Sequence, residues 1–233
     1  MMLMKQLVKL ICLTGLSLVV SGCSADDGTL AGSFFWGSHL TLNGIDQLTL
    51  YFTSETLVYT GDLKGTWPTC EAASDVCKPY TYSGTASSLT IDGKPATLEG
   101  NKLTLDGQSY RKLGTAAAGA RWDTVLTYSN SSGLCPTYCS YYTEYLTFRP
   151  DGTFIRSSVA SGSGAVVDYA VVPADSKGTY EVRADRFLLL AFANGTQRLE
   201  TLGMYPADDG SYPSNASAGI VLDSDGYFDI GGS

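Results

Sequence analysis

Short alternations of apolar and polar residues, separated by Asp-Gly and Asn-Gly pairs, constrain the fold of this chain more than any other feature. Beyond residue 28, Asp-Gly occurs at 92–93, 106–107, 151–152, 209–210 and 225–226, and Asn-Gly at 43–44 and 194–195. Both pairs supply the positive φ angles that tight hairpin turns require. Leu48, Leu50 and Phe52 show the two-residue period of a half-buried strand, and no stretch of ten or more residues has helical spacing. The sequence therefore predicts an all-β antiparallel meander.

The order of these segments repeats once along the chain, which indicates two β units at 29–113 and 114–230. The matched residues of the two units are Trp36 with Trp122, Leu50 with Leu146, Phe52 with Phe148, Val58 with Phe154, and Tyr82 with Tyr180. Two small barrels in tandem are expected. One larger closed barrel or sandwich built from the two repeats is the alternative. Either arrangement removes the exposed strand edges that cause aggregation.

The charge balance limits the class of partner. The chain has 15 Lys and Arg against 23 Asp and Glu, a formal net charge of −8. Binding to nucleic acid is not expected, because such proteins need a basic surface that displaces counterions from phosphates. No cofactor is expected either. After residue 22 there is no apolar run of 18 residues, so we expect no transmembrane helix.

The amino-terminal residues have the pattern of an export signal. Lys5 and Lys9 precede an apolar run over 10–20, which is too short to span a bilayer. The run ends in Val20-Ser21-Gly22-Cys23, which resembles the lipobox of bacterial lipoproteins. The resemblance implies that residues 1–22 are a signal peptide, that Cys23 is lipidated, and that 23–28 form a short tether to the membrane. Ser24, the residue after the cysteine, implies the outer membrane in such systems.

The barrels have a family resemblance of their own. Trp36 and Trp122, each at the start of a unit and followed by hairpin signals, resemble the opening strands of lipocalin-like domains in bacterial lipoproteins. That resemblance implies a meander of antiparallel strands closing on itself in each unit.

Four cysteines remain beyond Cys12 and Cys23: Cys70, Cys77, Cys135 and Cys139. An even number in an oxidising compartment predicts two disulfides, for which three pairings exist. We favour the local pairing, Cys70 with Cys77 and Cys135 with Cys139. Cys135 and Cys139 also resemble, at a distance, the Cys-x-x-Cys pair of envelope-stress and copper-homeostasis lipoproteins, although three residues separate them here. A metal or redox stress sensor is therefore an alternative function.

Residues for other chemistry are scarce. His39 is the single histidine, and no Gly-x-Ser-x-Gly motif accompanies it. We therefore expect no enzyme activity and no metal site, with an uncharacterised hydrolase as a distant alternative.

A tyrosine- and threonine-rich strand is the predicted binding face. If Leu146 and Phe148 face the core, then Tyr142 and Glu144 share their side of the strand. Tyr141, Thr143 and Tyr145 then point outward, as does Tyr51 on the matching strand of the first unit. Such a face suits a glycan, a peptide strand or an envelope protein, and burial between the two units is the alternative. The expected function is a membrane-anchored, non-enzymatic binding or scaffolding module at the cell envelope. A small apolar ligand inside a barrel is a further expected partner.

Overall fold

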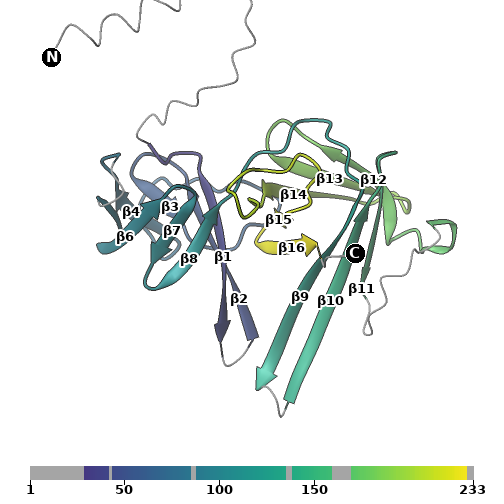
Figure 1. The fold of residues 1–233 in the computed structure, drawn as a ribbon, viewed down its shortest axis with the longest axis horizontal. Helices are drawn as coiled ribbons and strands as arrows, with labels where there is room; N and C mark the ends of the chain where they lie inside the picture. Colours follow the sequence, from purple (N-terminus) through teal and green to yellow (C-terminus); the bar gives the residue numbers. More distant parts are fainter. Residues whose placement is uncertain (1–28, 42–43, 85–87, 135–137, 159–168, 230–233) are drawn as a thin grey trace, which may run out of the picture.

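The computed structural model describes residues 29–41, 44–84, 88–134, 138–158 and 169–229, with the backbone alone given for 131–134 and 138–141. Within these residues the strands form two closed antiparallel barrels of eight strands each (Figure 1). The predicted all-β fold of two tandem barrels is confirmed, and the two units do not merge into one larger barrel.

Each strand of the first barrel pairs with the next one along the chain, and β1 closes the ring by pairing with both β2 and β8. Its strands are β1 (Phe34–Thr41), β2 (Gly44–Phe52), β3 (Leu57–Tyr59), β4 (Cys77–Thr81), β5 (Leu89–Ile91), β6 (Lys94–Glu99), β7 (Lys102–Leu105) and β8 (Gln108–Lys112).

The second barrel follows the same order and closes through β16 and β9. Its strands are β9 (Thr124–Leu134), β10 (Tyr138–Phe148), β11 (Thr153–Ser158), β12 (Lys177–Val182), β13 (Phe187–Phe192), β14 (Gln197–Met204), β15 (Ile220–Leu222) and β16 (Asp225–Asp229), with the 3-10 turn η2 (Tyr169–Val171) before β12.

The predicted turns account for much of this meander. Asp92 and Asp106 have φ angles of 52°, and the glycine after each is also positive, so both pairs form two-residue hairpin turns. Asp225-Gly226 was expected to be such a turn and is not, because both residues pair with β15 and the turn lies two residues earlier. Gly226 is required for a different reason: a Cβ there would lie 2.5 Å from the Trp36 ring.

The two interiors share part of the predicted repeat. Phe52 pairs with Val58 across β2 and β3, as Phe148 pairs with Phe154 across β10 and β11. The matching of Trp36 with Trp122 does not hold in the structure. The Trp122 ring lies in the core of the second barrel, whereas the Trp36 ring lies outside the first barrel, in the cluster between the two.

That cluster joins the barrels, and we call it the seam. It consists of Phe34, Trp36, Leu63, Leu113 and Val221, with Tyr51, Tyr59, Trp67, Tyr205 and Phe228 packed against them. The Trp36 ring lies 5.4 Å from the Phe228 ring and 5.9 Å from the Tyr205 ring, measured between centroids. Its indole nitrogen donates a 2.8 Å hydrogen bond to the Ser224 carbonyl. The seam therefore combines aromatic packing with directed hydrogen bonds.

The β3–β4 connection extends the seam toward the second barrel. The backbone nitrogens of Leu63 and Gly65 donate to the side chains of Ser224 and Asp223, both at 2.9 Å. Gly65 has a φ of +64°, and a Cβ there would lie 2.6 Å from the Leu199 carbonyl oxygen. A larger residue at this position would therefore push the connection away from β14.

Arg186 makes a further contact across the seam. Its guanidinium lies 4.6 Å from the centre of the Trp67 ring and donates a 2.7 Å hydrogen bond to the Gly32 carbonyl. Burial lowers the pKa of Arg186 from its ordinary value. This cation–π contact and hydrogen bond link the β12–β13 turn to the start of the first barrel.

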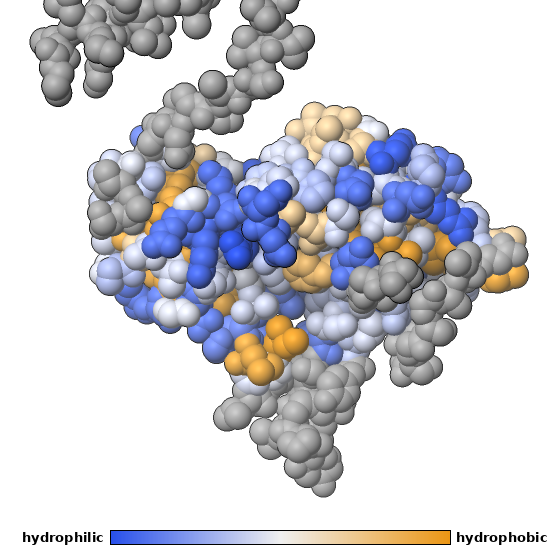
Figure 2. All heavy atoms as spheres, in the orientation of Figure 1, coloured by the Kyte–Doolittle hydropathy of each residue, from blue (hydrophilic) through white to orange (hydrophobic). Residues whose placement is uncertain are grey.

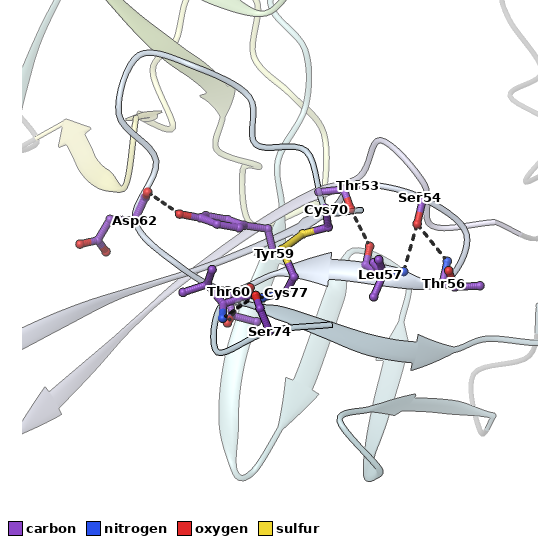
Figure 3. The surroundings of a disulfide bond; sticks show 11 residues. Thr53, Ser54, Thr56, Leu57, Tyr59, Thr60, Asp62, Cys70, Ser74 and Cys77 are labelled. Carbon is purple, nitrogen blue, oxygen red and sulfur yellow. Dashed lines mark hydrogen bonds between the residues drawn. A yellow bond between two sulfur atoms is a disulfide. The ribbon is translucent and has the colours of Figure 1, made fainter. Parts of the chain in front are cut away.

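A disulfide closes the β3–β4 connection. Cys70 and Cys77 are bonded, as the preferred local pairing predicted, and tie the connection to the first residue of β4 (Figure 3). Cys135 lies outside the described residues, as does the side chain of Cys139, so the second predicted disulfide stays a prediction. In the part of the chain that the structure describes, no helix is long and apolar enough to cross a membrane.

Replacing Trp36 with alanine tests the seam. We expect Trp36→Ala to lower the free energy of unfolding by about 3–5 kcal/mol, the usual loss for a buried aromatic side chain. Urea unfolding followed by circular dichroism measures this loss. Val171→Ala is the control, because Val171 is 75 % exposed on η2. A loss no larger than that of the control would mean that the seam adds little to stability.

Candidate functional site

The first barrel has a pocket of about 220 Å³ at one end of its interior. It is lined by Gln47, Leu48, Thr49, Leu50, Thr60, Asp62, Lys78, Ile91, Asp92, Lys94, Leu105, Asp106 and Tyr110. These residues come from β2, β4, β5, β6, β7 and β8, from the start of the β3–β4 connection, and from the two Asp-Gly turns. The opening therefore lies at the end of the barrel where those turns gather.

Apolar side chains form the floor of the pocket. Leu50, Ile91 and Tyr110 belong to the barrel core, and Leu48 and Leu105 pack against it. They alternate with outward residues along their strands, which is why one side of each strand faces the interior. The floor therefore offers a ligand apolar contact.

Charged side chains of both signs form the rim. Lys78 lies 3.8 Å from Asp92, and Lys94 lies 2.7 Å from Asp106, measured between nitrogen and oxygen. The hydrogen bond from Lys94 to Asp106, together with the negative charge of that carboxylate, raises the pKa of Lys94. Exposed pairs of this kind stabilise a protein by only about 0–1 kcal/mol. A charged group of a ligand can therefore replace one member of such a pair with little loss of stability.

The wall that carries Thr60 and Asp62 is held in place. The Thr60 nitrogen donates a 2.8 Å hydrogen bond to the Val76 carbonyl, next to the disulfide. The Tyr59 hydroxyl donates to the Asp62 carbonyl at 3.0 Å, which leaves the Asp62 carboxylate pointing away from Tyr59 (Figure 3). This side of the pocket is therefore already formed without a ligand.

The second barrel contains a cluster of charged residues in its interior, near the β9–β10 hairpin. Arg156 on β11 donates from three nitrogens: Nε to Glu144 at 2.7 Å, one terminal nitrogen to Glu200 at 2.7 Å and the other to the Tyr227 hydroxyl at 2.9 Å. Tyr227 and Tyr142 in turn donate to the Glu144 carboxylate at 2.7 and 2.9 Å. We call these five residues the Arg156 cluster.

The Arg156 cluster is nearly balanced in charge and closely bonded. Burial alone would lower the pKa of Arg156, but the negative charges of Glu200 and Glu144 outweigh burial and raise this pKa. Burial raises the pKa of Tyr227. Both groups therefore keep their protons at any ordinary pH, so the cluster is a fixed set of donors and acceptors that links β10, β11, β14 and β16.

Three buried side-chain oxygens, those of Thr127, Glu200 and Gln47, have no hydrogen-bond partner among the described residues. Glu200 is 3 % exposed, and its Oε2 atom is buried without a hydrogen-bond partner among the described residues. The same holds for the Oε1 atom of Gln47, which belongs to the pocket lining of the first barrel. A buried acceptor without a donor is unfavourable, so each of these oxygens lowers the stability of the fold.

The predicted binding face divides between two places. Thr143 and Tyr145 are half-buried on β10, on the opposite side of the strand from the buried Leu146 and Phe148. Tyr51 lies in the seam, with its ring centre 4.6 Å from that of Trp67. The side chain of Tyr141 lies outside the described residues. Tyr51 thus follows the alternative of burial between the units.

Other residues singled out in the sequence have mixed outcomes. Glu144 lies on the interior side of β10 and receives the Tyr142 hydroxyl, as the alternation predicted. His39 is exposed on β1, opposite Asp46. Cys23 lies outside the described residues. In the part of the chain described here, no group of three or more His, Cys, Asp and Glu side chains could hold a metal ion.

Neither the pocket nor the Arg156 cluster was predicted from the sequence. The segment Ile91-Asp92-Gly93-Lys94 carried a usable signal, because counting by two from Ala96 places Lys94 on the interior side of β6. No comparable signal connects Arg156 with Glu200, since 44 residues separate them. Comparison of the chain with protein-family models, with characterised proteins and with solved structures gave no match.

Removing Arg156 tests the cluster. We expect Arg156→Met to lower the free energy of unfolding by about 3–5 kcal/mol, because Glu144 then stays buried without its counter-charge and Glu200 keeps only the exposed Arg198. Arg183→Met is the matched control, since Arg183 is 42 % exposed in its pair with Asp185. Urea unfolding of both variants at pH 7 measures the difference. Equal stability of the two variants would show that the cluster is not needed for folding.

Asp225 gives a pH-dependent prediction. Burial raises its pKa above the ordinary 3.8, so the folded protein loses stability as the pH rises from that value to the raised one. Asp225→Asn removes this loss. We expect the variant to be more stable than the parent at pH 7, and the advantage to vanish as the pH falls below about 3.8. Unfolding at a series of pH values measures it, with the exposed Asp208→Asn as control. An advantage that persists at low pH would refute the assignment.

Proposed function

We propose that this chain is a bacterial outer-membrane lipoprotein, tethered through a lipid on Cys23, whose two-barrel body is a non-enzymatic binding module of the cell envelope. The Val-Ser-Gly-Cys sequence at 20–23 supports the tether. The pocket of the first barrel is the observation that carries the binding role, because it joins an apolar floor to a rim of paired charges. Small-ligand sites combine apolar walls with a few polar groups that orient the ligand, and this pocket has both in a smaller volume.

The point of attachment gives the module an orientation. Leu30 is buried in the first barrel, and the Gly32 nitrogen donates to the carbonyl of Phe52, the last residue of β2. The pocket lies toward the other end of β2, at Gln47 and Leu48. The tether thus reaches the barrel at the end away from the pocket. A six-residue tether extends at most about 20 Å, so the pocket faces away from a membrane that lies close beneath the body.

Both barrels direct their longest hairpins to that same side. The β1–β2 and β9–β10 hairpins extend together beyond the barrels (Figure 1), and Gly44 pairs with Ser132 where they meet. Figure 2 shows a largely hydrophilic face over the first barrel, with a hydrophobic group near the β1–β2 hairpin, where Leu40 is 76 % exposed. These features favour a partner in the envelope space over one in the lipid layer beneath.

Replacing the lipidated cysteine tests the tether. We expect the full chain, expressed in a Gram-negative host fed an alkyne fatty acid, to be labelled and to enter solution only with detergent. Cys23→Ala should lose the label completely, because Cys23 is the cysteine of the lipobox. Cys12→Ala is the matched control and should keep the label, since residue 12 belongs to the proposed signal peptide. Label on Cys23→Ala, or an unlabelled parent that dissolves without detergent, would refute the tether.

A further inference from the structure

The pocket of the first barrel has a charge pattern that selects among small ligands. Its rim carries two ammonium groups, Lys78 and Lys94, and three carboxylates, Asp62, Asp92 and Asp106. An anionic ligand would face the three carboxylates, and a cationic one would face the two ammonium groups. A ligand with both charges a few bonds apart can face both kinds of group. The rim is therefore complementary to a zwitterion.

The donors of an ammonium group also fit the acceptors of the rim. A ligand ammonium group has three N–H donors and no acceptor. It can therefore donate to more than one rim carboxylate, such as Asp92 and Asp106, which a carboxylate alone cannot do.

The volume and floor of the pocket limit the rest of the ligand. A volume of about 220 Å³ equals roughly seven water molecules at about 30 Å³ each. That space is too small for an acyl chain of membrane lipid or for an oligosaccharide. Leu48, Leu50, Ile91 and Leu105 surround it with apolar side chains, so the ligand also needs a compact apolar group.

We propose that this pocket binds a free α-amino acid with an aliphatic side chain, its apolar group on the leucine and isoleucine floor and its two charges among Lys78, Lys94, Asp92 and Asp106. The inference rests on the proposed function as a binding module, and it names the ligand class of that module. The opening faces away from the tether, which leaves the pocket accessible to solutes of the envelope space.

Three probes with the same apolar group separate the possibilities: L-leucine, which has both charges, 4-methylpentanoate, which has the carboxylate alone, and 3-methylbutylamine, which has the ammonium alone. Isothermal titration of the full-length lipoprotein in detergent, with empty micelles as the blank, measures each affinity at pH 7. We expect L-leucine to bind at least tenfold more tightly than either analogue. Equal or tighter binding of an analogue would overturn the zwitterion assignment, and the absence of binding by all three would overturn the amino-acid site.

Variants locate the binding. Lys94→Gln and Asp92→Asn should each weaken L-leucine binding at least fivefold. Lys102→Gln is the matched control, because Lys102 is exposed on β7 outside the pocket lining, and it should bind as the parent does. All three changes are at exposed positions, so thermal unfolding of each should match the parent. Unchanged binding in Lys94→Gln and Asp92→Asn would place L-leucine elsewhere and refute the site. Fatty-acid labelling of Cys23 is independent of these titrations, so failure of the ligand and failure of the tether are distinguishable.

Discussion

The contact of the Trp36 ring with the second barrel is the constraint on which the arrangement of the two units depends. Each barrel is closed by its own strand pairs, and in the described part of the chain the barrels are joined by the pairing of Gly44 with Ser132 and by a bridge between Gly114 and Met204. The seam provides the rest through aromatic rings and hydrogen bonds from the β3–β4 connection. The seam also explains why residue 226 is glycine, because the Trp36 ring leaves no space for a side chain there.

The two barrels use their interiors differently at the end near the long hairpins. The second barrel places an arginine, two glutamates and tyrosines there, with the arginine satisfied by three acceptors. Those groups fill the space with a fixed network, which favours a structural role. The first barrel places its charges on the rim and lines a pocket with leucine and isoleucine. The same topology thus produces one filled interior and one that can receive a ligand.

The sequence predicted the strands, the tandem barrels and the Cys70–Cys77 disulfide, because period-two alternation, turn pairs and short cysteine spacing are local signals. It also placed Glu144 on the interior side of β10 by alternation alone. The matching of Trp36 with Trp122 failed because the two residues are not at equivalent positions: Trp36 lies within β1, whereas Trp122 precedes β9. The partners of Glu144 could not be predicted from the sequence, because Arg156 and Tyr227 approach it only when the second barrel closes. Alternation predicted that Tyr51 points outward, and in the structure Trp67 of the β3–β4 connection packs against it.

The side-by-side position of the two long hairpins has a consequence for avidity. With the seam holding the barrels in one orientation, residues at the two hairpins keep a set spacing. A macromolecule that touches the β1–β2 hairpin would meet the β9–β10 hairpin at a high effective concentration. The second contact would then form without a further loss of rotational and translational freedom. Two weak contacts could add up to firm attachment on this side of the protein.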